Sequence, residues 1–240
     1  RSSYADASTY DVPYATEYTS TATPTISNLS GATNTFGASL YFAQEVGNNE
    51  IALKILKDLD FPIAAPSANI ATKTSITSIN DLDIQLKNIF YIDGGSSVLG
   101  LESTVIQTTK KGCKILRLGS LTIETIQNKF SDYIIEIEDS KLSPGNQLKH
   151  YSPNKTIRIN VKNVFNNEAL LNFGKNNLKS NIKNINLSIS GDLIEASYNF
   201  YNYLNILDKS HCDGIAVAPI PNHNLGKTIN DRLKRAAHED

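Results

Sequence analysis

The chain has 240 residues and a mass of 26.3 kDa, which is enough for one large domain or two domains of about 100 residues each. Hydrophobic residues make up 40% and charged residues 20% of it, a composition typical of a folded protein and not of a disordered chain. The formal net charge of −1 argues against a broad positive surface for nucleic acid or acidic membranes, and no apolar run reaches the roughly 18–20 residues of a membrane span.

Targeting signals and metal-binding patterns are not found in the sequence. Residues 1–45 hold no basic region followed by an apolar stretch, so we expect no secretory signal and a cytoplasmic location. Cys113 and Cys212 are far apart, which favours two reduced thiols over a disulfide framework or a metal site. Asp192 and Glu195 fit the acidic start of a helix better than a metal site. We therefore expect no metal-ligating residues.

Residues 1–45 differ in composition from the rest of the chain. Ser, Thr, Tyr and Ala make up more than half of this segment, and no Lys occurs before Lys54. A change this sharp marks a boundary, and it leaves open a disordered leader, a foreign fusion or a stretch translated out of frame.

The spacing of apolar and turn-forming residues predicts a series of short elements between residues 50 and 130. They are a helix at 50–59, a buried strand at 61–65, a polar loop at 67–77, a helix at 78–86 capped by Ser78, a strand at 89–92 running into a turn at 93–95, two paired strands at 103–108 and 113–116, and a helix at 121–130 capped by Thr122.

A Pro-, Gly- and Asn-containing linker is expected next, followed by a regular alternation of strands and helices. The predicted elements are strands at 156–161, 185–189 and 214–218 and helices at 167–173, 191–207 and 228–237. Three such pairs favour a parallel sheet covered by helices. The predicted organisation is an atypical segment at 1–45, a first domain at 46–139, a linker at 140–153 and a second domain at 154–240.

Four polar segments follow predicted strands or form the linker, where ligand sites in α/β folds usually form. Ser67 and Asn69 offer a hydroxyl and an amide, and Arg117 emerges from an apolar strand as a bidentate donor for phosphate. Taken singly, each segment has a plainer explanation. Ser67 and Asn69 could be turn formers, Arg117 a surface ion pair, and His150 with Tyr151 anchors of the linker.

Taken in order, the segments resemble the threonylcarbamoyl-AMP synthase family. Its A-P-S-A-N, G-L-E-S-T-V, I-L-R-x-G and S-P-G-x-x-x-x-H-Y-x-P segments correspond to residues 65–69, 100–105, 115–119 and 143–153. Residues 215–221 and 230–237 look like the end of its accessory domain, so the resemblance covers about 46–240. It implies an α/β fold, with a partial YrdC-like mixed-sheet domain followed by a smaller Rossmann-like three-layer domain.

The resemblance implies an enzyme that joins L-threonine, bicarbonate and ATP into threonylcarbamoyl-AMP and releases pyrophosphate, a nucleotidyltransferase-type reaction. The product serves the threonylcarbamoyladenosine modification of tRNA, so tRNA or other tRNA-modification proteins are expected partners and a membrane is not. Mg²⁺ is expected to accompany ATP as a cofactor.

The resemblance also implies roles for single residues. The implied ATP-binding residues are Ser67, Asn69, Ser75, Arg117 and His150, the implied threonine-binding residues are Ala65 and Ser103, and Tyr151 would belong to a linker lid. No catalytic nucleophile is implied, since this chemistry needs positioning and electrostatic stabilisation. We expect the ligand site where Ser67, Ser103 and Arg117 converge.

The family's P-T-E-T-x-Y-G-L and K-R-P segments have no counterpart here, and Arg1 is the one basic residue in 1–45. Charge-assisted bonds to a triphosphate are worth roughly 1.5–3 kcal/mol each, so we expect little or no synthase activity from this chain. An enzyme whose catalytic half is supplied elsewhere or is no longer recognisable, and a non-catalytic nucleotide- or RNA-binding remnant, both stay open. The linker and second domain disfavour a carbamoyltransferase module of the hydrogenase-maturation type.

Overall fold

The computed structural model describes residues 50–58, 68–70, 73–83, 91–97, 99–137 and 152–237. The chain divides into two units, one formed by residues 1–62 with 108–110 and the other by residues 63–107 with 111–240. The domain bounds expected from the sequence, at 46–139 and 154–240, stay a prediction.

The described part of the first unit includes the end of a strand, at residues 108–109, and the helix α2, Glu50–Lys57. This helix confirms the one expected at 50–59, although it ends two residues earlier. Lys54 and Lys57 lie in its last turn, where positive charge interacts favourably with the helix dipole.

A three-stranded sheet follows, with the order β1-β2-β3. The strands are β1 Val105–Thr109, β2 Gly112–Arg117 and β3 Ile134–Ile137, and the helix α3, Ile123–Lys129, connects β2 to β3. β2 and β3 are parallel, and Ile115 of β2 packs with Ile123 and Ile126 of α3 in a small core. Thr122 caps α3 by accepting a hydrogen bond from the amide of Thr125, as the sequence predicted.

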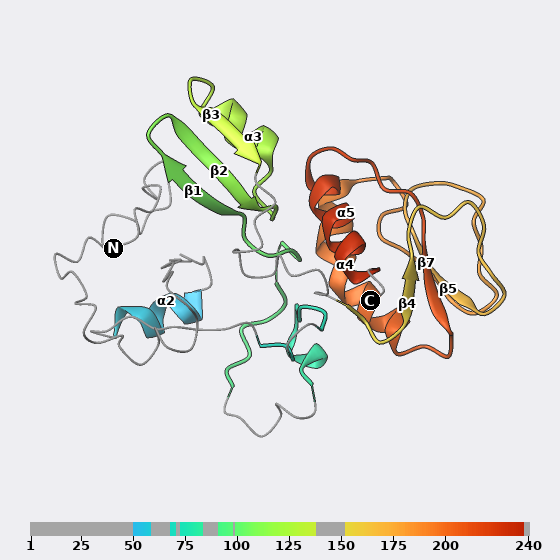
Figure 1. Cartoon of the computed structure of the whole chain (residues 1–240). Helices are drawn as coiled ribbons and strands as arrows, with labels where there is room; N and C mark the ends of the chain where they lie inside the picture. Colours follow the sequence, from blue (N-terminus) through green and yellow to red (C-terminus); the bar gives the residue numbers. More distant parts are fainter. Residues whose placement is uncertain are drawn as a thin grey trace, which may run out of the picture. The chain divides into compact units, whose positions relative to one another are not determined.

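A separate four-stranded sheet has the order β4-β7-β5-β6, and all its neighbouring strands are parallel. Its elements are β4 Thr156–Arg158, β5 Glu168–Asn172, β6 Asn184–Asn186, α4 Leu193–Asp208, β7 Gly214–Val217 and α5 Leu225–Ala236. The two helices lie side by side along one face of this sheet (Figure 1). The α/β fold class expected from the sequence is confirmed.

The main core fills the space between this sheet and its helices. Leu171 and Val217 face α4 and α5, whereas Leu170 and Ala216 point to the opposite face and pack with Val161. Alternation along each strand therefore produces two apolar clusters. The larger one, on the helix side, includes Leu101, Phe200, Tyr201, Leu204 and Leu233.

The helix expected at 167–173 is wrong, because this segment forms β5. Glu168, Ala169, Leu170 and Leu171 are all buried, as in a central strand of a parallel sheet. Ala, Leu and Glu are strong helix formers, so local propensity favoured the wrong element and tertiary packing overrode it.

The helix expected at 78–86 is also wrong in extent. The structure has one 3₁₀ turn, Ile79–Asp81, and Leu82 continues it in an extended conformation with its side chain buried. The Ser78 side chain does not cap this turn. Residues 84–90 lie outside the described residues, and Tyr91 and Ile92, expected to end a strand, are exposed and not part of one.

The other expected elements occur with shifted ends. The turn at 93–95 forms, with the amide of Gly95 donating to Oδ1 of Asp93 at 2.9 Å. The helix expected at 191–207 is α4, whose N-cap Asp192 accepts hydrogen bonds from the amides of Ile194 and Glu195. β3 had not been predicted, since Ile134 and Ile137 are exposed and give no clear alternation. The strand expected at 61–65 lies outside the described residues.

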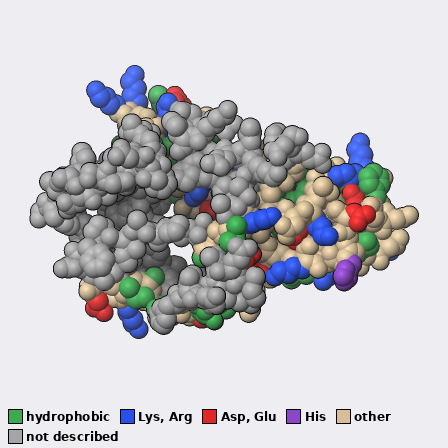
Figure 2. Space-filling model, turned by 60° about the horizontal axis from the view of Figure 1, so that its bottom comes forward, with side chains coloured by type: hydrophobic (Ala, Val, Ile, Leu, Met, Phe, Trp, Pro, Cys, Tyr) green, Lys and Arg blue, Asp and Glu red, His purple; other side chains and the backbone are tan. Residues whose placement is uncertain are grey.

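None of the described helices is long and apolar enough to span a membrane. On the face shown in Figure 2, the described Lys and Arg side chains are interspersed with Asp and Glu and do not gather in one patch. Cys113 and Cys212 are free thiols, and burial raises the pKa of Cys113.

Candidate functional site

Arg117 and Ser103, two of the residues singled out in the sequence, lie in contact. Arg117 is the last residue of β2, and its Nη2 donates to the backbone oxygen of Ser103 at 2.9 Å and to Oγ at 3.2 Å. Its Nε donates to the same backbone oxygen at 3.2 Å. Two nitrogens of the guanidinium thus hold the turn before β1, while the phosphate contact expected of Arg117 stays a prediction.

The backbone after Arg117 approaches this turn closely. A Cβ added at Gly119 would lie 2.3 Å from the carbonyl carbon of Ser103, a distance that only glycine avoids. The amide of Ser120 donates to the backbone oxygen of Glu102 at 2.9 Å. The I-L-R-x-G and G-L-E-S-T-V segments therefore meet along their backbones as well as through Arg117.

A cavity of about 300 Å³ is lined in part by the same turn. Its lining comes from four segments of the chain and comprises Ala68, Asn69, Ser75, Ile76, Thr77, Ser97, Gly100, Leu101, Glu102 and Tyr201. Its size is at the lower end of the range for small-molecule sites. Two of the predicted ATP-binding residues, Asn69 and Ser75, are in this wall.

Asn69 shapes its own loop, because its side-chain amide donates to the backbone oxygens of Ile70 and Lys73 at 3.1 and 3.0 Å. Ser75 instead reaches across to the next segment, where its hydroxyl donates to Oε1 of Glu102. The loop expected at 67–77 is thus tied to the turn that carries Ser103.

Glu102 is the centre of the contacts around the cavity. Oε1 also accepts from the hydroxyl of Tyr201 at 2.7 Å, and Oε2 accepts from Nε of Arg232 at 2.9 Å. Burial alone would raise the pKa of Glu102. The charge of Arg232 and the hydrogen bonds from Ser75, Tyr201 and Arg232 outweigh that effect, so the pKa is lowered and the group is ionised at neutral pH.

Helix α5 holds the backbone that follows Arg117. Arg232, whose side chain is 0% exposed, donates from Nη2 to the backbone oxygen of Leu118 at 2.6 Å. The hydroxyl of Thr228 donates to the backbone oxygen of Gly119 at 2.9 Å. Lys227 pairs with Glu124 of α3 at 2.6 Å.

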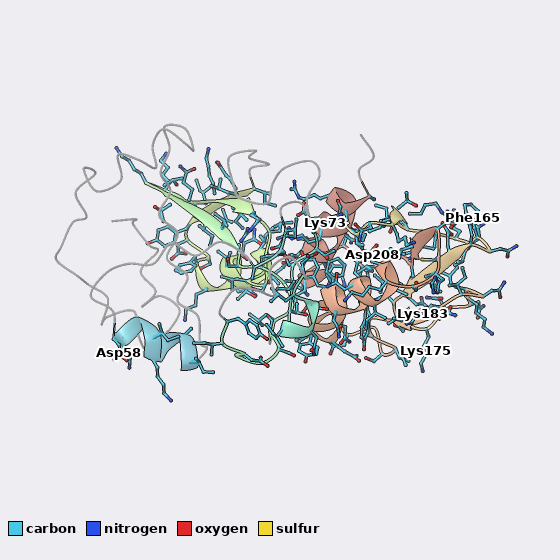
Figure 3. All side chains as sticks on the ribbon, turned by 90° about the horizontal axis from the view of Figure 1, so that it is seen from below. Asp58, Lys73, Phe165, Lys175, Lys183 and Asp208 are labelled. Carbon is cyan, nitrogen blue, oxygen red and sulfur yellow. The ribbon has the colours of Figure 1, made fainter. Side chains whose placement is uncertain are left out.

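Helix α4 holds the loop that carries Ser75. The hydroxyl of Thr74 donates to Oδ1 of Asn205 at 2.6 Å. One residue earlier, the Lys73 ammonium donates to Asn154, whose amide donates in turn to Asp208 at 2.8 Å. Figure 3 labels Lys73 and Asp208, which lie close together.

The structure describes only some of the sequence-predicted site residues. Ala65, Ser67, His150 and Tyr151 lie outside the described residues, so the expected convergence of Ser67 with Ser103 and Arg117 stays a prediction. The described ones, Asn69, Ser75, Ser103 and Arg117, lie around two adjoining features, the cavity and the Arg117–Ser103 contact. The ligand-binding roles assigned to them stay predictions as well.

Glu102, Tyr201 and Arg232 were missed as site residues. Glu102 belongs to the G-L-E-S-T-V segment, in which the sequence suggested a ligand role for the hydroxyl of Ser103 and none for the carboxylate. Arg232 belongs to the C-terminal stretch that resembled the family's accessory domain. Nothing in the local sequence of either residue shows that they pair, since 130 positions separate them.

Among the described residues that line the cavity, Glu102 is the one with a formal charge at neutral pH, and that charge is negative. In the part of the chain that the structure describes, no group of three or more His, Cys, Asp or Glu side chains is placed to hold a metal ion. The cavity is thus lined by hydroxyl, amide and apolar groups around one neutralised carboxylate.

Comparison with known families identifies both halves of this arrangement. A family model named Sua5_C and described as the threonylcarbamoyl-AMP synthase C-terminal domain matches residues 121–238. A second model, Sua5_yciO_yrdC, with the description Telomere recombination, matches residues 28–119. The chain belongs to the threonylcarbamoyl-AMP synthase family. The second match begins inside the segment expected to be atypical, so the YrdC-like domain is recognised over more of the chain than the four segments indicated.

Individual members of the family cover most of this chain. The threonylcarbamoyl-AMP synthase of Pyrococcus abyssi is 30% identical over 210 residues, which are 79% of this chain and 62% of the relative. That of Schizosaccharomyces pombe is 28% identical over 235 residues, or 82% and 57% of the two chains. The chain therefore spans less than two thirds of the length of these relatives.

Among solved structures, the crystal structure of P. abyssi Sua5 complexed with L-threonine is similar, with a TM-score of 0.64 and 27% identity. The match covers 79% of this chain and 62% of that one. This likeness supports a YrdC-like domain followed by a Rossmann-like domain.

Proposed function

We propose that this chain is an L-threonylcarbamoyladenylate synthase, which acts on L-threonine, bicarbonate and ATP and supplies threonylcarbamoyl-AMP for tRNA modification in the cytoplasm. The observation that carries the proposal is the meeting of Arg117 and Ser103, beside a cavity lined by Asn69 and Ser75. Arg117, Ser103 and Asn69 come from three of the four segments that the family shares, and Ser75 follows the first of these segments. The relatives named as synthases support the reaction.

The described side chains suit a reaction that proceeds by positioning. Arg117 places a positive charge at the end of a strand for a phosphate oxygen, the hydroxyl oxygen of Ser75 can accept a hydrogen bond, and the hydroxyl of Ser103 can donate one to a ligand group. In nucleotidyl transfer a new bond forms to the α-phosphorus and the bond to pyrophosphate breaks. Donors held in place on rigid segments stabilise the charge that develops there without having to reorganise.

Mg²⁺ belongs to the proposal as a companion of ATP. The described residues offer no cluster of carboxylates or imidazoles that fits a resident ion. Mg²⁺ is commonly held by one or two carboxylates together with substrate phosphates, so the triphosphate itself would supply most of its ligands.

The charge of the cavity favours slow turnover. ATP brings about four negative charges, whereas the described lining residues include no Lys or Arg and their one charged member, Glu102, is already paired with Arg232. A non-catalytic protein of this family that binds a nucleotide or RNA is therefore the second candidate, and the lack of a cation among those described lining residues is the observation that favours it.

Pyrophosphate release by the purified chain with L-threonine, bicarbonate, ATP and Mg²⁺ tests the proposal, together with calorimetric titration of ATP and L-threonine. We expect both ligands to bind and pyrophosphate release to be slow and to require L-threonine. Binding without threonine-dependent release would favour the second candidate. Turnover as fast as that of the P. abyssi relative, measured alongside, would contradict the argument from charge, and failure to bind either ligand would overturn the proposal.

A further inference from the structure

The turn that precedes β1 is fixed by helices far along the chain. Three successive residues make the contacts. Gly100 packs so tightly on α4 that an added Cβ would lie 2.2 Å from the backbone oxygen of Ser197. Leu101 is buried in the main core between the four-stranded sheet and its helices. Glu102 pairs with Arg232 of α5.

The next residue along the chain is Ser103, the predicted threonine-binding residue, which is held by Arg117. Arg232 therefore acts on both segments that form this contact. Through Nε it holds Glu102 on one segment, and through Nη2 it holds the backbone oxygen of Leu118 on the other. A single guanidinium therefore connects the two segments, while its Nη1 donates to the neighbouring Asp231.

The carboxylate of Glu102 also contacts a third segment, the loop that carries Ser75. Oε1 of Glu102 accepts the hydroxyls of Ser75 and of Tyr201, so the predicted ATP-binding Ser75 is oriented by a group that Arg232 keeps ionised and in place. The loops carrying three predicted ligand residues thus converge on one buried ion pair.

The energetics of burial indicate what this pair contributes. Removing two charges from water costs about as much as their attraction returns, so a buried ion pair is a weak source of net stability. Arg232 lies on α5 among residues that are themselves buried, such as Leu233 and Ala236, so burial at this position does not by itself require a charge. The guanidinium of Arg232 contributes directionality instead, because its planar set of N–H groups gives each hydrogen bond a fixed direction.

We propose that Arg232 is a positioning residue of the ligand site, which acts through Glu102 to set the relative placement of Ser75, Ser103 and Arg117. The inference rests on the proposed function for the nature of the ligands, while the positioning itself is a property of the fold. It makes helix α5 of the C-terminal domain part of the site's construction through a side chain that is itself buried.

The variant Arg232→Lys tests the proposal, since lysine keeps the charge but cannot donate to Glu102 and Leu118 in the same fork. The matched control is Arg158→Lys, which alters another ion pair of the same domain, Arg158–Glu168, and none of the site segments. Tyr201→Phe is a milder second variant, which removes one hydrogen bond to Glu102 and keeps the ring.

Amide hydrogen exchange measured on the whole chain shows how firmly the segments of the site are held together, and it needs no bound ligand. The reporter is the amide of Ser120, which donates to the backbone oxygen of Glu102. We expect Arg232→Lys to speed its exchange by about tenfold or more, and Tyr201→Phe by less, while Arg158→Lys leaves it within about twofold of the wild type. Equal protection in Arg232→Lys and in Arg158→Lys would overturn the positioning role. If Arg232→Lys fails to fold, the exchange rate of the Ser120 amide in Tyr201→Phe is compared with that in Arg158→Lys. Equal rates in these two variants would then overturn the positioning role.

Calorimetric titration with L-threonine and ATP tests whether the placement of these segments affects ligand affinity. We expect about tenfold weaker binding in Arg232→Lys at a temperature where it and Arg158→Lys are equally folded, with the control unchanged. Unchanged affinity in Arg232→Lys would overturn the inference. A wild type that binds neither ligand would count against the proposed function alone, because hydrogen exchange still decides whether Arg232 holds the segments.

Discussion

Replacing Glu168 by glutamine tests the ion pair that anchors β5. Glu168 is 6% exposed and lies at the start of that strand. Its Oε1 and Oε2 accept from Nε and Nη2 of Arg158, both at 2.7 Å, and Oε2 also accepts from the amide of Phe165 at 2.8 Å. The guanidinium lies 3.9 Å from the centre of the Phe165 ring, which fixes the pair further.

The expected loss can be estimated from these contacts. Hydrogen bonds to charged groups contribute roughly 1.5–3 kcal/mol each, and glutamine places an NH₂ donor against at least one of the three donors. The side chain of Arg158 is 38% exposed, so water screens the pair and solvates the guanidinium once its partner is lost. We therefore expect Glu168→Gln to lower the free energy of unfolding by about 2 kcal/mol at pH 7.

Urea denaturation followed by far-ultraviolet circular dichroism measures this loss, since the chain contains no Trp. With a slope of about 2 kcal/mol per molar urea, the midpoint should fall by about 1 M. Glu136→Gln, at an exposed position of β3, is the matched control and should change the free energy of unfolding by less than about 0.5 kcal/mol.

The effect also has a defined pH dependence. Hydrogen bonds from Arg158, which outweigh burial, lower the pKa of Glu168 below its ordinary value, and the amide of Phe165 and the Arg158 charge add to this. A group with a lowered pKa stabilises the fold above its unfolded-state pKa, about 4.3 for Glu, and loses that contribution as the pH falls through the folded-state value. The difference between wild type and Glu168→Gln should thus be constant between about pH 6 and 8 and shrink below about pH 4. Equal midpoints at pH 7 would refute the reasoning and, with it, the assignment of 168–172 to a strand beside Arg158.

Three further substitutions probe the turn, a helix start and the Arg117 contact. Gly100→Ala forces a Cβ against Ser197 at a φ of +64° and should cost roughly 1–3 kcal/mol in urea denaturation, so an unchanged midpoint would contradict the packing on α4. Asp192→Ala removes the N-cap of α4 and should cost about 1 kcal/mol, with a correspondingly lower midpoint. Arg117→Lys keeps the charge but loses the fork to Ser103, and we expect about tenfold weaker ATP binding by calorimetry, whereas equal binding would exclude Arg117 from the site.

Where the determinant was local, the sequence predicted the structure well. The Thr122 and Asp192 caps lie within three residues of the amides they accept, and the helices they begin are α3 and α4. A turn at Lys110 and Lys111 joins β1 and β2, the two strands that the sequence predicted to pair. Such features depend on a few neighbouring residues, so the local sequence contains the information that determines them.

Where the determinant was distant, the sequence misled. The Glu-Ala-Leu-Leu-Asn run of β5 consists largely of good helix formers, and its strand conformation is imposed by pairing with β7 and β6 on either side. The 3₁₀ turn at 79–81 replaces a longer helix because Leu82 turns into the interior. In both places burial of apolar side chains outweighed local preference.

The candidate site contains residues of both kinds, some recognisable from the local sequence and some defined by distant contacts. Ser103 and Arg117 stood out because hydroxyl and guanidinium groups after strands are recognisable without their surroundings. Arg232 did not, although the sequence held a usable signal. Ile229, Leu233 and Ala236 form the buried stripe of α5, and Arg232 lies within that stripe. A charged residue at such a position cannot be left unpaired in the interior, so it predicts carboxylate partners close by. One partner of Arg232 is its neighbour Asp231, and the other is Glu102, which lies in a segment already singled out for ligand binding. The first of these partners can be found from the local sequence, whereas the second depends on how distant segments fold together.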